Sequence, residues 1–235
     1  MKEFDVDFIF RYWPQILPYL IVTFFVVAAS VLLGLLLGFL LAAAKLGRNS
    51  LGKLLANGYT TILRCTPSVV LLFVVYYGLP ALLLELFAVD INDIYKGIFV
   101  IVTLSLLFAA TMSEVMRSAY QSIDKGQYEA AVCVGLTPAQ AFRRIVLPQC
   151  FYVALPNFGN AIIALTKEGA LAFTIGFIDI TGKANLIVSL NMGAHSREIY
   201  LGLAIMYWMI SFGLEKLLKK MEKWFGKGRR VVGSY

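Results

Sequence analysis

The stretch ILPYLIVTFFVVAASVLLGLLLGFLLAAA, from Ile16 to Ala44, decides the fold class because it contains no Asp, Glu, Lys or Arg. The hydrocarbon core of a bilayer is about 30 Å thick, and a helix needs about 20 apolar residues to cross it. Four further segments are apolar enough, although Pro67 and Pro80 interrupt the first of them. Together with residues 16–44, the predicted spans are residues 56–87, 97–120, 151–178 and 199–218. We therefore expect an all-α membrane protein with five transmembrane helices, forming one domain over residues 1–235.

The composition agrees with a membrane protein and disfavours several other classes. Hydrophobic residues make up 60% of the 235 residues and charged residues 15%, against roughly 45–50% and 25% in soluble domains. The net charge of +7 does not indicate nucleic-acid binding, because the basic residues cluster between the apolar segments. Three cysteines without metal-type spacing and one histidine predict neither a disulfide framework nor a metal site. The acidic residues in the opening MKEFDVDFIF do not fit a cleavable signal peptide.

Lysine and arginine residues are distributed unevenly between the two sides of the predicted spans. Those that follow the first, third and fifth spans are Lys45, Arg48, Lys53, Arg117, Lys125, Arg143, Arg144, Lys216, Lys219, Lys220, Lys223, Lys227, Arg229 and Arg230. Those on the other side are only Lys2, Arg11, Lys96, Lys183 and Arg197. Basic loops remain in the cytoplasm. The distribution therefore predicts an external N-terminus and a cytoplasmic C-terminus.

Two glycine patterns in the first third of the chain need interpretation. Gly34 and Gly38 form a G-x-x-x-G pair, which either lets two helices approach closely or is a chance pair in a glycine-rich helix. The segment from Gly47 to Lys53 resembles a phosphate-binding loop, but Leu54 occupies the position of the magnesium-binding hydroxyl and no strand precedes it. We expect no nucleotide or other cofactor to bind here, so the energy for any transport must come from a partner.

The predicted cytoplasmic connection of about residues 121–149 is long and reads as two short capped helices. Asp124 is placed to cap the first helix with Gln127, and Gly135 to end it in a left-handed conformation. Thr137 and Gln140 predict a second capping box, with the next helix ending at Pro148. Such a rigid projection is suited to docking in a groove of another protein. An ordinary amphipathic connector is the alternative.

The same loop carries a resemblance to a known family. EAAVCVGLTPAQAFRRIVLPQ, from Glu129 to Gln149, resembles the EAA loop of the permease subunits of binding-protein-dependent ABC importers. RCTPSVVLLFVVYYGLP, from Arg64 to Pro80, and SEVMRSAYQSIDKGQ, from Ser113 to Gln127, are similar to segments of the polar amino-acid branch. Cys65 departs from the usual glycine, and Lys-Glu-Gly-Ala-Leu at residues 167–171 departs from the usual Lys-Asp-Thr-Ser-Leu. The first variant, together with Ala-Phe-Thr-Ile-Gly at residues 172–176, resembles cystine-type members.

The resemblance implies a function and a set of partners. It implies the membrane-spanning subunit of a type I ABC importer in the bacterial inner membrane, taking up a polar amino acid, with L-cystine suggested by the cystine-type variants, and not an enzyme in itself. Its partners would be membrane lipid, a second permease subunit, an external solute-binding protein and a cytoplasmic ATPase that holds ATP and Mg²⁺. The residues implied to couple to that ATPase are Tyr128, Glu129, Ala130, Ala131, Gly135 and Leu136. An ion-gradient-driven secondary transporter is the alternative, although no inverted repeat supports it.

Two charged residues lie deep in the fourth predicted span. Lys167 and Glu168 are about 16 residues past its cytoplasmic end, or about 24 Å along a helix that rises 1.5 Å per residue. Each charge at such depth costs at least about 2.5–3.5 kcal/mol, so it marks either a substrate pathway or a structural ion pair. Asn157 and Asn160 on the same span are weaker pathway candidates, as are Arg64 and Thr66 in the second span. Glu114 and Arg117, at helical i,i+3 spacing, predict a structural or gating pair.

Overall fold

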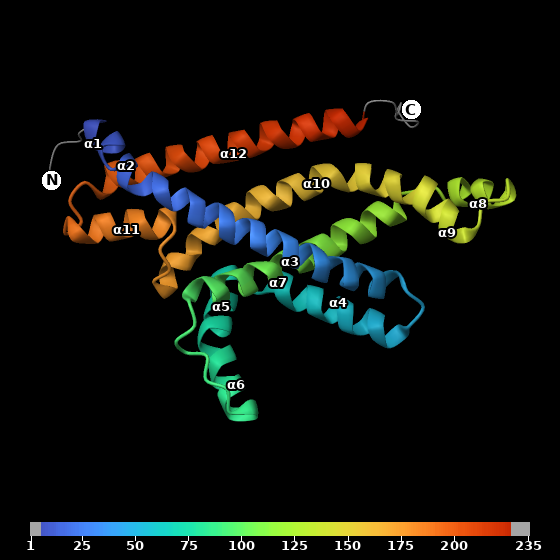
Figure 1. Cartoon of the computed structure of the whole chain (residues 1–235), viewed down its shortest axis with the longest axis horizontal. Helices are drawn as coiled ribbons and strands as arrows, with labels where there is room; N and C mark the ends of the chain where they lie inside the picture. Colours follow the sequence, from blue (N-terminus) through green and yellow to red (C-terminus); the bar gives the residue numbers. More distant parts are fainter. Residues whose placement is uncertain (1–5, 227–235) are drawn as a thin grey trace.

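The computed structural model describes residues 6–226, and that part of the chain consists of helices and connecting turns without a strand. Figure 1 shows the helices in chain order. They are α1 (Val6–Arg11), α2 (Trp13–Ile16), η1 (Leu17–Tyr19), α3 (Leu20–Leu46), α4 (Ser50–Cys65), α5 (Ser68–Phe73), η2 (Val74–Gly78), α6 (Leu79–Phe87), α7 (Lys96–Gln121), α8 (Lys125–Cys133), α9 (Pro138–Ala141), η3 (Phe142–Val146), α10 (Leu147–Glu168), η4 (Gly169–Ile175), α11 (Ile180–Leu190) and α12 (Ser196–Gly226). The segments η2 and η3 are π-helical, and η1 and η4 are 3₁₀-helical.

Helices long and apolar enough to cross a membrane recur along the described chain. Four such stretches are Val6–Leu46, Ser68–Phe87, Lys96–Gln121 and Ser196–Trp224. A fifth is obtained if Pro138–Ile175 and Ile180–Leu190, which meet at a bend of 42°, are counted as one span. The predicted all-α membrane class is confirmed. The first, third and fifth predicted spans coincide with these helices to within several residues, except that the first helical stretch begins earlier.

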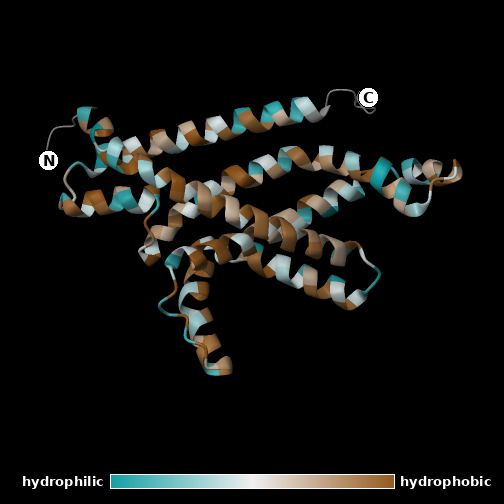
Figure 2. Cartoon of the chain, in the orientation of Figure 1, coloured by the Kyte–Doolittle hydropathy of each residue, from teal (hydrophilic) through white to brown (hydrophobic). Residues whose placement is uncertain are grey.

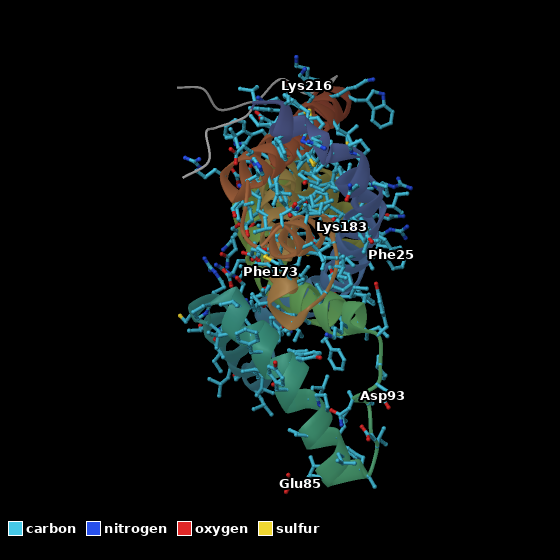
Figure 3. All side chains as sticks on the ribbon, turned by 90° about the vertical axis from the view of Figure 1, so that its left-hand side faces the viewer. Phe25, Glu85, Asp93, Phe173, Lys183 and Lys216 are labelled. Carbon is cyan, nitrogen blue, oxygen red and sulfur yellow. The ribbon has the colours of Figure 1, made fainter. Side chains whose placement is uncertain are left out.

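The second predicted span, residues 56–87, begins too early, because the stretch that could cross a membrane is Ser68–Phe87. The predicted interruption at Pro67 is confirmed. The chain leaves the helical conformation at Thr66 (ψ 126°) and Pro67 (ψ 136°), so that α4 ends and α5 begins as a separate helix. The cause is local, because the ring of Pro67 disfavours the helical conformation for the residue before it. Pro80 does not interrupt the helical stretch Ser68–Phe87, because the π-helical turn η2 precedes it and accommodates its missing N–H. Figures 1 and 3 show α5 and α6 projecting as an arm from the other helices, with Glu85 at its tip and Asp93 on the connection that returns to α7.

The helix pair α3 and α7 forms the centre of the bundle, and the G-x-x-x-G pair lies in its seam. A Cβ atom at Gly34 would approach the carbonyl oxygen of Ser105 to 2.9 Å, and one at Gly38 would lie 3.0 Å from the Cβ of Met112. Only glycine permits this approach of the two backbones. The pattern is therefore a packing feature within the chain and not a chance pair.

Apolar side chains lie on the outside of the bundle as well as in it. Phe108 and Met112 are buried in the main core, whereas Ile21, Leu32 and Leu36 of α3 are more than half exposed. Figure 2 shows that α3 is hydrophobic over most of its length. Such a surface is suited to lipid or to a partner subunit, because in water it would be an unusually large exposed apolar area.

The basic connections lie together at one end of the described molecule. The turn between α3 and α4, the α8–α9 segment and the last described turns of α12 share this end, whereas α1, α11 and the start of α12 lie at the opposite end (Figure 1). Lys227, Arg229 and Arg230 of the predicted basic tail, and Lys2, lie outside the described residues. The helix α11 was not predicted. It packs with α12 in a second core around Ile180, Ile187 and Met206.

Candidate functional site

The helix α8 carries most of the predicted coupling residues and displays them on the surface. Its start is fixed by Asp124, whose side chain accepts a hydrogen bond of 2.7 Å from the N–H of Gly126. Tyr128, Glu129 and Ala130 are exposed, whereas Ala131 is 7% exposed and faces the protein. The helix therefore offers one face to solvent and holds its position by the other.

Gly135 ends α8 in the predicted left-handed manner. Its φ is +92°, a conformation that a side chain disfavours. The N–H of Gly135 donates to the carbonyl of Val132 at 3.0 Å, and the N–H of Leu136 donates to the carbonyl of Ala131 at 3.1 Å. This pair of bonds is the Schellman motif, which satisfies helix-terminal carbonyls and fixes the exit direction of the chain. Gly135 thus sets the angle at which the half-buried Leu136 follows α8.

The chain after α8 runs into the membrane-crossing helix without a break. Thr137 accepts a bond from the N–H of Gln140 at 3.3 Å and donates its own N–H to the Gln140 side chain at 3.0 Å, so the predicted capping box is confirmed. The prediction that Pro148 ends this helix is wrong. The π-helical turn η3 precedes Pro148, and the N–H of Leu147 bonds the carbonyl of Phe142, five residues back. This wider turn carries the helix past the proline, which has no N–H of its own.

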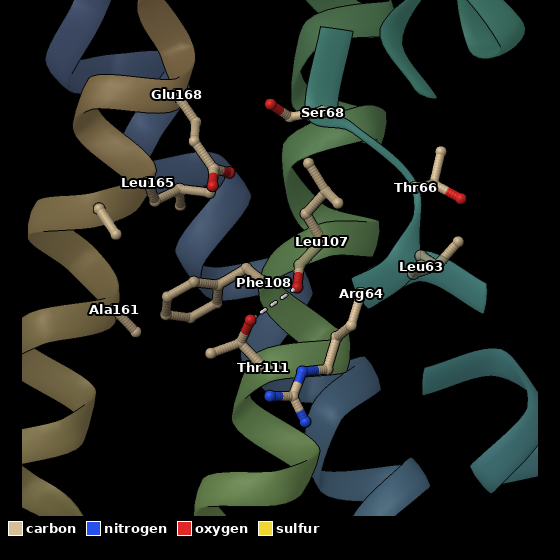
Figure 4. Close-up of a pocket in the computed structure, with 11 residues that line it drawn as sticks. Leu63, Arg64, Thr66, Ser68, Leu107, Phe108, Thr111, Ala161, Leu165 and Glu168 are labelled. Carbon is tan, nitrogen blue, oxygen red and sulfur yellow. Dashed lines mark hydrogen bonds between the residues drawn. The ribbon is translucent and has the colours of Figure 1, made fainter. Parts of the chain in front are cut away.

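An open pocket lies between α4, the start of α5, α7 and α10. Its volume is about 260 Å³. Its polar lining residues are Arg64, Thr66, Ser68, Thr111 and Glu168, and its apolar wall includes Phe108 and Leu165. Figure 4 shows Arg64 and Glu168 reaching into the pocket from different helices on either side of α7. One cationic and one anionic group thus share a pocket with a mixed polar and apolar lining.

The pocket brings together three of the six predicted pathway residues. Arg64, Thr66 and Glu168 line it, and Glu168 shares a helix face with Ala161, Ala164 and Leu165. Lys167, Asn157 and Asn160 do not line it; all three are exposed on α10. Their part in a pathway stays a prediction. Neither Lys167 nor Glu168 forms an ion pair within 4.0 Å among the described residues.

Two polar lining residues were missed by the sequence interpretation. Ser68 follows directly after the Thr-Pro pair, and Thr111 lies in the third predicted span one turn before Glu114. Both hydroxyls were recognisable as polar groups in apolar segments. Their location at a pocket was not, because it depends on how α4 and α5 meet α7.

The Glu114–Arg117 pair is confirmed and belongs to a larger cluster. The Glu114 Oε2 accepts from Arg117 Nη2 at 2.6 Å. Its Oε1 accepts from Lys45 Nζ at 2.6 Å, a contact that brings the end of α3 to α7.

The turn that resembles a phosphate-binding loop has a structural role. The Asn49 side chain accepts bonds from the N–H groups of Leu51 and Gly52, at 3.0 and 3.4 Å, and so caps α4. These N–H groups are the ones that a phosphate would need. Within residues 6–226, His, Cys, Asp and Glu side chains form no group of three placed to hold a metal ion.

Comparison with known sequences gives a consistent result. The family model described as binding-protein-dependent transport system inner membrane component matches residues 34–226. The L-cystine transport system permease protein TcyL of Bacillus subtilis (strain 168) is 39% identical over 233 residues, which cover 98% of this chain and 96% of TcyL. The probable amino-acid permease protein YxeN of the same organism is 34% identical over 231 residues, which cover 98% of this chain and all of YxeN.

Solved structures agree with this result. A chain from the crystal structure of an amino acid ABC transporter with histidines is 31% identical, with a TM-score of 0.82, and the match covers 94% of this chain and 99% of that one. A chain of the MetNI methionine ABC transporter in an inward-facing conformation is 18% identical, with a TM-score of 0.64 and coverage of 89% and 94%. The second likeness is one of fold.

Proposed function

Because the chain belongs to the family of inner membrane components of binding-protein-dependent transport systems and is an amino-acid ABC transporter permease, we propose that it imports L-cystine. The match to TcyL over nearly the full length of both chains supports this substrate. Membership of this family excludes the alternative of an ion-gradient-driven secondary transporter, because an ABC permease is energised by an ATPase. In this proposal the chain catalyses no reaction, and ATP and Mg²⁺ are held by the partner.

The pocket is the observation that carries the proposal. An amino acid has one carboxylate and one ammonium group, and the pocket offers Arg64 for the first and Glu168 for the second. The planar guanidinium of arginine binds a carboxylate through two parallel hydrogen bonds. The apolar wall around Phe108 accommodates the uncharged middle of the substrate. L-cystine carries a zwitterion at each end, of which one would lie between Arg64 and Glu168.

The exposed face of α8 is the proposed contact with the ATPase. Tyr128, Glu129 and Ala130 would lie against a groove of that subunit, while Gly135 and Leu136 hold the angle of the helix. The continuous run from Thr137 through α10 to Glu168 would join this contact to the pocket. A second permease subunit, a solute-binding protein and membrane lipid complete the proposed assembly. The excess of basic residues beside α8 supports a cytoplasmic location for this end and for the C-terminus.

A transport assay with matched carboxylate variants tests the proposal. Proteoliposomes would contain the permease, its ATPase and binding protein, and uptake of radiolabelled L-cystine would be measured with and without internal ATP. Glu168→Gln should lower uptake about tenfold or more, because a hydrogen bond to a charged group contributes roughly 1.5–3 kcal/mol. Glu215→Gln, at an exposed carboxylate far along α12, is the control and should retain uptake. Uptake without ATP would contradict the mechanism, and full uptake by Glu168→Gln would contradict the assignment of the pocket.

A further inference from the structure

A buried lysine joins three helices beside the pocket. The Lys45 side chain, at the end of α3, is 1% exposed. Its Nζ donates to Thr60 Oγ1 on α4 at 2.5 Å, to Ser113 Oγ on α7 at 2.9 Å and to Glu114 Oε1 on α7 at 2.6 Å. An ammonium group has three N–H donors. All three are therefore used, and each of the three helices contributes to one cluster, here called the Lys45 clamp (Lys45, Thr60, Ser113 and Glu114).

The charge of the clamp is balanced within the protein. Glu114 neutralises Lys45, and its second oxygen accepts from Arg117 Nε at 3.1 Å and Nη2 at 2.6 Å. Arg117 in turn donates to the side chain of Gln121, the last residue of α7, at 2.6 Å. Removing one partner from a buried ion pair strongly destabilises a protein, because the other charge stays buried without compensation. The clamp is therefore expected to persist while α3, α4 and α7 stay in this arrangement.

On α4 and on α7, the clamp lies one helical turn from a residue that lines the pocket. On α4, Thr60 precedes the pocket residue Arg64 by four residues. On α7, the clamp residue Glu114 follows the pocket residue Thr111 by three residues. A bond from Lys45 to Thr60 thus fixes the wall that carries Arg64 relative to the wall that carries Thr111.

Packing alone does not fix α4 as it fixes α3. The seam between α3 and α7 is held by the close approach at Gly34 and Gly38. Most of α4 is exposed, and its buried residues are only Ala56 and Thr60. Besides the clamp, α4 reaches α7 through the Tyr59 hydroxyl, which donates to the carbonyl of Leu106 at 3.0 Å. Hydrogen bonds therefore contribute much of what keeps α4 in position.

We propose that Lys45 is a positioning residue for substrate recognition: through Thr60 it sets the distance of Arg64 from the opposite pocket wall. This inference rests on the proposed function of the pocket. Lys45, which lies outside the pocket, would then control the affinity of the pocket for the amino acid. A purely structural clamp would instead affect the stability of the whole bundle without a selective effect on affinity.

The sharpest variant is Thr60→Val, which removes the α4 branch of the clamp and leaves the Lys45–Glu114 pair. Its control is Thr181→Val, which removes a hydroxyl of similar burial that lies 2.9 Å from the Tyr207 hydroxyl in the second core, away from the pocket. Lys45→Met and Lys45→Arg complete the series, since arginine retains the charge and the donors. All variants are compared in the full transporter with its ATPase and binding protein, in nanodiscs.

Three quantities are measured: the L-cystine concentration at half-maximal stimulation of ATP hydrolysis, the maximal rate and the melting temperature. Thr60→Val should raise the half-maximal concentration about tenfold, equivalent to about 1.4 kcal/mol, with the maximal rate retained. Its melting temperature should fall no further than that of Thr181→Val. Lys45→Met should raise the half-maximal concentration further than Thr60→Val does. Lys45→Arg should raise it less than Lys45→Met does. An unchanged half-maximal concentration in Thr60→Val would overturn the proposal.

Hydrogen exchange separates failure of the clamp from failure of the substrate assignment. Amide exchange in residues 60–65 of α4 should be faster in Thr60→Val and unchanged in Thr181→Val, whatever the substrate. If the unmodified transporter does not respond to L-cystine, the substrate assignment fails, and the exchange measurement alone decides whether the clamp fixes α4. Unchanged exchange in Thr60→Val would overturn the positioning role independently.

Discussion

Replacement of Gly135 tests the proposed link between α8 and the ATPase in a way that isolates the backbone. A Cβ at Gly135 would meet no atom within 4 Å, so the cost of a side chain comes from the conformation and not from a clash. At a φ of +92° that cost is about 1–2 kcal/mol for an ordinary residue. Such a change alters an equilibrium constant by a factor of about 5–30. Gly135→Val should therefore release the Schellman motif in a large share of molecules and turn α8 away from its docking angle.

The control is Gly58→Val, because a Cβ there also meets no atom within 4 Å but the residue lies inside α4 without a positive φ. Gly135→Asn should be intermediate, because asparagine tolerates the left-handed conformation better than other residues. Each variant is purified in mild detergent through a tag on the ATPase, and the permease-to-ATPase ratio and amino-acid-stimulated hydrolysis are measured. Membrane insertion should be normal throughout. The reasoning is refuted if Gly135→Val retains both the ratio and the stimulation of the unmodified protein.

Three further predictions address packing, capping and topology. Gly38→Leu should lower the melting temperature of the permease, because its Cβ alone would lie 3.0 Å from that of Met112 and overpacking costs about 1–3 kcal/mol. An unchanged melting temperature would contradict the close packing of α3 against α7 at this glycine. Thr137→Ala should weaken the start of α9 by about 1 kcal/mol, seen as faster amide exchange there, and Thr137→Ser should retain protection. Cysteines at Asp90 and Lys53 should be labelled from opposite sides of the membrane by an impermeant maleimide, and labelling from the same side would exclude the predicted topology.

The sequence predicted the number and class of the spans better than their breaks. Hydropathy integrates over about 20 residues, so it finds α3 and α7 but does not by itself tell that the second span begins only after the Thr66–Pro67 break. The dipeptide carried a recognisable signal, since a proline restricts the residue before it. At Pro148 the same reasoning failed, because the π-helical turn η3 absorbed the proline. A local rule gives the strain at a proline but not the way in which the neighbouring turns relieve it.

The candidate site was predictable in its chemistry and only partly in its geometry. Depth within a span singled out Lys167 and Glu168 together, because both lie at nearly the same height. Adjacent residues on a helix point about 100° apart, and only the packing of α10 against α7 decides that Glu168 faces the pocket. The pairing of Glu114 with Arg117 follows from spacing along one helix. The approach of Lys45, 69 residues away in sequence, does not.

The extended dipeptide between α4 and α5 gives the chain a joint with few degrees of freedom. Peptide planarity leaves two torsions per residue, and the proline ring fixes one of these for Pro67. The direction of α5 and α6 relative to α4 is thus governed by three torsions, two at Thr66 and one at Pro67. Rotation about them requires neither helix to unwind. Since Arg64 lies just before this joint and Ser68 just after it, a swing of the arm would change the width of the pocket while both helices remain intact.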